Sequence, residues 1–255
     1  MVREALGKHY FGMNKEFRFR GEEPGRLENF SDAAFALAIA LLLISTSAPT
    51  NLEQLKKFAW ELIPFSVSIV LIVLIWHEHF VFFYRYGLRN TKVIVLNTIF
   101  LIIVLFYVYP LKFLWKYLLL NPIARAFNQE SIIKEVSEMA RPEDTGSLMI
   151  IYGIGAASIF LILMLMYRYA LKNSDQLQLN KIEEFDTRVS MTTNFLMATV
   201  PMLSVILAWI FQGSPWAGMI SGFAYFLYMP LMFTYSIGRS KRRKKVLMEF
   251  SSSLT

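Results

Sequence analysis

The 255-residue chain contains no cysteine, which excludes disulfide bonds and thiolate metal sites. It also lacks an HExxH motif, a nucleophile elbow and a pair of aspartates within one apolar run. These absences argue against an enzyme. We therefore predict no catalytic residue, no metal and no cofactor.

Long apolar runs are abundant. Hydrophobic residues make up 55% of the chain, and the mean hydropathy is +0.43. A bilayer core about 30 Å thick needs roughly 20 apolar residues in a helix. Six runs meet this length, so we predict an all-α membrane protein with six transmembrane helices, approximately at Asn29–Ala48, Leu62–Tyr86, Val93–Leu118, Leu148–Leu171, Val189–Phe211 and Trp216–Gly238.

Basic residues predict the orientation of these helices. If the chain crosses the membrane once at each of the six spans, both termini lie on the same side, and 19 of the 26 Lys and Arg lie on that side. The positive-inside rule then places both termini in the cytoplasm. The expected organisation is a cytoplasmic segment 1–28 with no cleavable signal, a six-helix channel domain 29–238 and a basic cytoplasmic tail 239–255.

The connections between the runs carry further expectations. Gln212–Pro215 predicts a tight hairpin between the last two helices. The loop before the fourth run has helical spacing over 131–140 and predicts a short amphipathic surface helix. Segment 180–187 is acidic and predicts a solvated linker. The basic run in the tail is expected to contact anionic lipid headgroups, with RNA binding as the less favoured alternative.

The first apolar run has two different faces. At about 100° per residue, Leu37, Leu41 and Ile44 share one stripe, with Ala40 at its edge. Asp32 lies on the opposite side. An aliphatic stripe of this kind usually packs against other helices, so spacing alone does not define a pore.

Asp32 is the unusual residue, because an intramembrane carboxylate is costly and normally has a partner. Helix depth predicts that several polar residues converge with it near the cytoplasmic side: Arg26, Ser31, Trp76, His77, Glu78, His79, Asn97 and Asn194. Metal binding and proton relay are possible roles. His77 and His79 are two residues apart and so point to different faces, which favours a structural hydrogen-bond network.

The opening of the first helix carries a motif. Arg26, Phe30, Ser31 and Asp32 are spaced as R-x-x-x-F-S-D. In this position, the string resembles the signature of the transmembrane protein 175 family of potassium channels. The resemblance extends over the whole chain, with six helices, cytoplasmic ends and polar residues on helices two and three.

The resemblance implies a homotetramer whose pore is lined by the first helices. Family members lack the TVGYG filter, and that string is absent here. Their narrow point is a ring of aliphatic side chains five residues after the motif aspartate, which is Leu37. Further pore-facing positions correspond to Ala40, Leu41 and Ile44. The polar network between helices corresponds to Arg26, Asp32, His77 and Asn97, so Arg26 and Asp32 are expected to face back into the bundle.

One position departs from the family pattern. Members often have threonine three residues after the constriction, where this chain has Ala40. A hydroxyl there could coordinate a partly dehydrated cation, so its absence affects how well the pore selects potassium.

The expected function is passive conduction of potassium and other monovalent cations in the inner membrane of a prokaryote. The partners are other copies of the chain and membrane lipids, and no nucleic acid. The alternatives are a secondary transporter and an assembly factor without transport.

Overall fold

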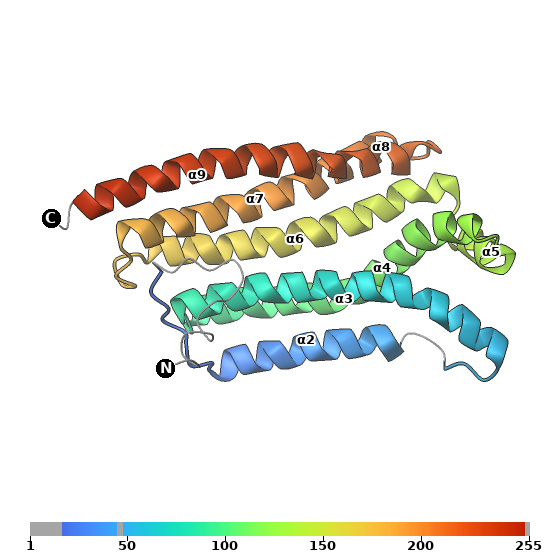
Figure 1. Ribbon diagram of the computed structural model, residues 1–255, viewed down its shortest axis with the longest axis horizontal. Coiled ribbons are helices and arrows are strands. Elements are labelled where there is room, and N and C mark those ends of the chain that lie inside the picture. Colours follow the sequence, from blue (N-terminus) through green and yellow to red (C-terminus); the bar gives the residue numbers. More distant parts are fainter. Residues whose placement is uncertain (1–16, 45–47, 253–255) are drawn as a thin grey trace.

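The computed structural model describes residues 17–44 and 48–252, and these residues form helices joined by short connections (Figure 1). In chain order, the helices are α2 (Arg26–Ile44), α3 (Leu52–Tyr86), α4 (Thr91–Ala126), α5 (Glu130–Met139), η1 (Pro142–Asp144), α6 (Thr145–Lys172), α7 (Lys181–Ile210), α8 (Ala217–Phe223), η2 (Ala224–Leu227) and α9 (Tyr228–Ser252).

Within these ranges, six helical segments are long and apolar enough to cross a membrane, which confirms the six predicted spans. Three of these spans begin with an asparagine cap. Asn51, Asn90 and Asn180 each accept a backbone N–H of the following first turn. Gly87 ends α3 with a φ of 58°, a conformation that favours glycine. These caps satisfy backbone groups where the chain leaves a helix.

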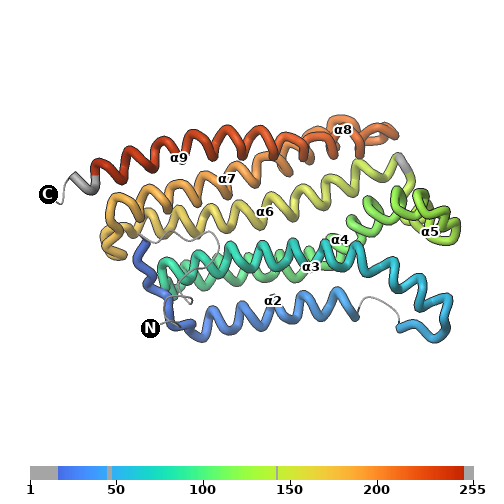
Figure 2. The backbone as a smooth tube through the Cα atoms, in the orientation of Figure 1, coloured from blue at the N-terminus to red at the C-terminus, as the bar shows by residue number. Residues whose placement is uncertain are grey.

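The helices pack in an order that follows the sequence. α2 contacts α3 and α4, α6 packs on α4 and α7, and α9 packs on α7 at the far side. Figures 1 and 2 show α2 and α9 on opposite edges of the bundle. α2 starts and α9 ends at the same end of the bundle, which we call the terminal end. α2 is thus an edge helix with one open side.

α3 and α4 are much longer than α2. They have 35 and 36 residues, against 19 in α2, and they extend beyond it at the end opposite the terminal end. α5 lies there and confirms the predicted amphipathic helix. Its Ile132 and Val136 pack against Leu120 and Ala124 of α4. We call this end of the bundle the α5 end.

The predicted solvated linker at 180–187 is wrong. α7 begins at Lys181, and Glu183 is fully buried. Arg18 and Arg20, from the segment before α2, form ion pairs with Glu183 at 3.3 and 2.9 Å. Asn180 and Glu183 also form a capping box. The acidic residues therefore anchor a helix start rather than facing water.

The basic run near the C-terminus continues the last helix. α9 runs without interruption through Gly238 to Ser252. Arg243 packs back on α7, with its Nε 3.2 Å from an Asp186 carboxylate oxygen. The neighbouring Arg242 and Lys244 are exposed. The part of the predicted tail that the structure describes is thus a continuation of α9. It packs on α7 through Arg243 and exposes basic side chains on its outer side.

Candidate pore-lining helix and its polar contacts

α2 divides into a buried face and an exposed face. The buried face packs into the core and consists of Glu28, Ser31, Phe35, Ala38 and Leu42. The exposed face is polar in its first turns, at Arg26, Asn29 and Asp32, and otherwise apolar. Its apolar residues are Phe30, Ala33, Ala36, Leu37, Ala40, Leu43 and Ile44. Half of the helix surface is therefore left uncovered by its own subunit.

The predicted pore residues fall mainly on the exposed face. Leu37 is 51% exposed and Ile44 is 74% exposed, and Ala40 lies between them on the same side. Leu41 is half-buried and packs against the core. Three of the four positions thus lie open along one side of α2, and Leu41 lies at the edge of that side.

A buried chain of hydrogen bonds holds α2 against α3 and α4. The Ser31 hydroxyl donates to the carbonyl of Leu27 at 2.9 Å, so its oxygen accepts from Asn97 Nδ2, also at 2.9 Å. The Asn97 carbonyl oxygen then lies 2.7 Å from His79 Nε2, which must donate to it. Each of the three side chains is nearly inaccessible. The chain fixes the rotation of α2 about its axis.

Aromatic contacts reinforce this attachment. The Phe35 ring lies 5.6 Å from the His79 ring and 6.1 Å from the Phe100 ring, centroid to centroid. His79 and Phe100 stack at 5.3 Å with an interplanar angle of 10°. The imidazole is therefore held on its faces as well as at Nε2. Because one face of α2 is fixed in this way, the opposite face is directed outward.

The histidine of this network differs from the one selected from the sequence. His79, not His77, bonds to Asn97, and His77 is half-buried on a different face of α3. The buried residues of α3 recur at Ser68, Ile72 and His79. This helical spacing could have identified the correct histidine. Asn194 is also not part of the network, because its Nδ2 donates to the Ser190 carbonyl in its own helix.

Asp32 and Arg26 lie elsewhere than expected. Asp32 is exposed within the single subunit and accepts a 2.8 Å hydrogen bond from Trp76 Nε1. Arg26 and Phe30 are exposed on the open side of α2. The expectation that Arg26 and Asp32 face back into the bundle therefore needs correction. The motif residue that does so is Ser31.

A second contact at the start of α2 was not foreseen. Glu28 is buried, and its carboxylate accepts a 2.9 Å bond from Arg89 Nε and a 3.1 Å bond from the Gly25 backbone N–H. Arg89 also donates to the carbonyl of Glu23. The pair ties the first turn of α2 to the α3–α4 connection. Its sequence signal was weak, since Glu28 lies in a polar stretch before the apolar run.

The described residues contain no group of three His, Cys, Asp or Glu side chains placed to hold a metal. The polar residues around α2 are instead engaged with one another. The site is therefore a helix with a fixed rotation and an open apolar side. Its class is a helical membrane protein of six spans whose first helix lies at the edge of the subunit.

Comparison with known proteins assigns this class to a family. The sequence family described as endosomal/lysosomal potassium channel TMEM175 matches residues 26–107. A protein of Marivirga tractuosa named potassium channel is 41% identical over 244 residues, covering 93% of this chain and 96% of that protein. The chain belongs to the TMEM175 family of potassium channels.

Solved structures agree with this assignment. The crystal structure of a variant of the potassium channel MtTMEM175, in complex with a nanobody–MBP fusion protein, superposes with a TM-score of 0.78. The two chains are 41% identical, and the match covers 90% of this chain and 99% of the other. The motif at the start of α2 thus identified the family, and a channel is favoured over the secondary transporter.

Proposed function

We propose that four copies of this chain form a potassium channel whose central pore is lined by the open side of α2. The proposal rests on one observation above all. The side of α2 away from the buried Ser31–Asn97–His79 chain is exposed, apolar from Ala33 onward, and held facing outward by that chain. A cyclic tetramer would bring four identical copies of this side together around one axis.

In the proposed pore, Leu37 forms the narrow point and Ile44 extends the apolar throat. Leu41, at the edge of the open side, contributes in part. Apolar constrictions close by losing water when the radius is small, so leucine side chains serve as a gate without any charged group. Conduction is passive and needs no catalytic residue, metal or cofactor.

Selectivity in this pore is expected to be weak. The chain has no TVGYG sequence to provide rings of backbone carbonyls. Ala40 offers no hydroxyl to a partly dehydrated cation. Potassium and other monovalent cations are therefore the proposed permeant species.

The proposed membrane is the inner membrane of a prokaryote, with both termini in the cytoplasm. Three observations support this placement. First, α2 starts and α9 ends at the same end of the bundle. Second, Lys and Arg are concentrated in the segments that lie at that end when the chain crosses the membrane six times. Third, the relative from Marivirga tractuosa is bacterial. The exposed cations of α9 would lie against anionic headgroups. Nucleic acid is not among the proposed partners.

The experiment is potassium flux through purified protein reconstituted in liposomes, with the oligomer measured on the same sample. We expect a tetramer and a potassium flux that persists without a coupled ion gradient. A correctly assembled tetramer that carries no potassium would overturn the proposal. Flux that saturates and requires a counter-ion would favour the transporter.

Two leucines of α2 provide a matched pair of variants. Leu37 and Leu43 are 51% and 54% exposed, and six residues of helix place them about 120° apart. Leu37 therefore lies near the middle of the open side with Ala40 and Ile44, whereas Leu43 lies at its edge beside Asp32, away from the proposed pore axis. We expect Leu37→Ala to raise conductance or relax selectivity, since it removes the narrow ring. Leu43→Ala removes the same atoms from the same helix and should leave conduction unchanged.

A further inference from the structure

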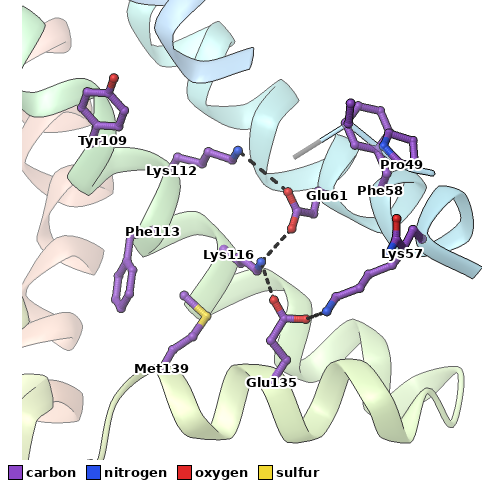
Figure 3. Close-up of a pocket in the computed structure, with 12 residues that line it drawn as sticks. Pro49, Lys57, Phe58, Glu61, Tyr109, Lys112, Phe113, Lys116, Glu135 and Met139 are labelled. Carbon is purple, nitrogen blue, oxygen red and sulfur yellow. Dashed lines mark hydrogen bonds and ion pairs between the residues drawn. The ribbon is translucent and has the colours of Figure 1, made fainter. Parts of the chain in front are cut away.

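A cavity of about 560 Å³ lies at the α5 end of the bundle, beside the chain that leaves α2. Ala48 and Pro49 line it on one side, and side chains of α3, α4 and α5 line the others (Figure 3). Its volume is within the range of small-molecule sites. Neither the proposed pore nor the polar network at the other end of α2 uses it.

Five charged side chains alternate along one wall of the cavity (Figure 3). Glu61 lies 3.8 Å from Lys112 Nζ and 2.7 Å from Lys116 Nζ, through different oxygens. Glu135 lies 2.7 Å from Lys116 Nζ and 2.6 Å from Lys57 Nζ, also through different oxygens. All four carboxylate oxygens thus face an ammonium group.

The row has one positive charge more than it has negative charges, because three lysines share two carboxylates. Lys57 is at its open end, with 52% of its side chain exposed, and makes one ion pair. An ammonium group keeps three donors, so lysine has further capacity for an acceptor. The polar wall therefore favours an anion over a cation.

The remaining wall is apolar and includes Phe58, Tyr109, Phe113 and Met139. The cavity also lies where α2 ends. The 19 residues of α2 span about 28 Å, close to the hydrocarbon thickness of a bilayer. Its end therefore marks the boundary between acyl chains and headgroups, where an amphipathic anion has its charged group.

We infer that this cavity binds the phosphate group of an anionic phospholipid, with Lys57, Lys112 and Lys116 as its cationic wall. The aromatic and thioether side chains contact the adjoining glycerol and acyl groups. Basic pockets between membrane helices bind anionic headgroups on the cytoplasmic side of membranes. The proposed orientation places this cavity at the opposite leaflet, where the same pairing of ammonium groups with a phosphate applies.

Binding here has a consequence for α2. Lys112 Nζ lies 3.4 Å from the carbonyl oxygen of Leu42, in the last turn of α2. A bound phosphate competes with that carbonyl for the Lys112 ammonium group. Lipid binding in the cavity therefore weakens a contact to the last turn of α2. This consequence depends on the proposed pore, whereas lipid binding does not.

The test measures lipid retained by the purified full-length protein, by native mass spectrometry after addition of phosphatidylglycerol or phosphatidylcholine. Lys57→Gln is the variant, and Lys56→Gln is the control, because Lys56 is exposed, adjacent and outside the cavity. We expect retention of phosphatidylglycerol over phosphatidylcholine, and a loss of about fivefold in Lys57→Gln only.

Equal retention by the two variants, or equal retention of the two lipids, would overturn the inference. Inorganic phosphate alone provides the second arm. Inorganic phosphate could bind more weakly to Lys57→Gln than to the wild type while no bound lipid is lost from the mass spectrum. That result would overturn the lipid assignment in favour of free phosphate. Glu135→Gln removes a competing carboxylate and should not weaken lipid binding. If it weakens binding while the melting temperature is unchanged, the cationic wall is not the binding element.

Discussion

Replacing Asn97 by alanine removes the centre of the buried chain that fixes α2. The wild-type side chain donates to Ser31 at 2.9 Å and lies 2.7 Å from His79 Nε2, with all three residues buried. Alanine leaves the His79 N–H without its acceptor. Single hydrogen bonds within membrane proteins contribute about 0.6 kcal/mol on average and about 1.7 kcal/mol at most. Loss of two bonds therefore predicts a destabilisation of about 1–3 kcal/mol.

Unfolding in mixed micelles by titration with a denaturing detergent measures this loss. Asn121→Ala is the control, since Asn121 is on the same helix and its hydrogen bond from Arg125 is exposed. A substitution of that kind usually changes stability by less than about 0.5 kcal/mol. The double variant Ser31→Ala/Asn97→Ala should lose less than the sum of the single variants, because they share one bond. Equal stability of Asn97→Ala and Asn121→Ala would refute the role assigned to the network.

Three further outcomes are expected. Asp32→Asn should reduce stability less than Asn97→Ala in the same titration, since the Trp76 bond to Asp32 is exposed; a larger loss would imply that Asp32 is buried in the oligomer. Ala40→Thr should raise the potassium-to-sodium permeability ratio about fivefold in bi-ionic potentials, if the ring of hydroxyls favours potassium by about 1 kcal/mol in total, and no change would place this residue outside the pore. Burial raises the pKa of Glu135, but the hydrogen bonds from its two lysine partners outweigh this and hold the pKa below its usual value. Its stabilisation is present above the unfolded pKa of about 4.3 and is lost as the pH falls through the lower folded value. Melting temperature should therefore fall with acidification in the wild type and less so in Glu135→Gln, while the exposed Glu138→Gln keeps the full dependence.

Much of the fold was predictable, because each span is long enough to be identified from hydropathy alone. The amphipathic helix α5 was predictable for a related reason, since Ile132 and Val136 recur at helical spacing. The start of α7 was missed, although Asn180 and Glu183 have the spacing of a capping box. The burial of its acidic residues was not predictable, because Glu183 and Asp186 are buried by ion pairs with residues distant in the sequence: Arg18, Arg20 and Arg243. Such long-range pairing leaves no local pattern.

The candidate site was predictable in its polar residues more than in its contacts. The depth of each residue along its helix correctly predicted that Ser31 lies level with Asn97, and Asp32 with Trp76. Depth does not determine rotation, however, and two histidines of α3 lie at nearly the same depth. The structure selects His79 because its side of α3 faces α2 and α4. Rotation about a helix axis was thus the missing quantity, and it also places Asp32 at the surface of the subunit.

The central claim is that the middle of the open side of α2, at Leu37, Ala40 and Ile44, lines the conduction pathway, and that Leu43 at its edge does not. The chain has no cysteine, so single cysteines introduced into α2 are the only reactive thiols. The most direct measurement is potassium current through Leu37→Cys and Leu43→Cys channels before and after a charged methanethiosulfonate reagent. The account predicts block of Leu37→Cys and no effect on Leu43→Cys. Block of Leu43→Cys alone, or of neither channel when labelling of both is confirmed by mass, would contradict it.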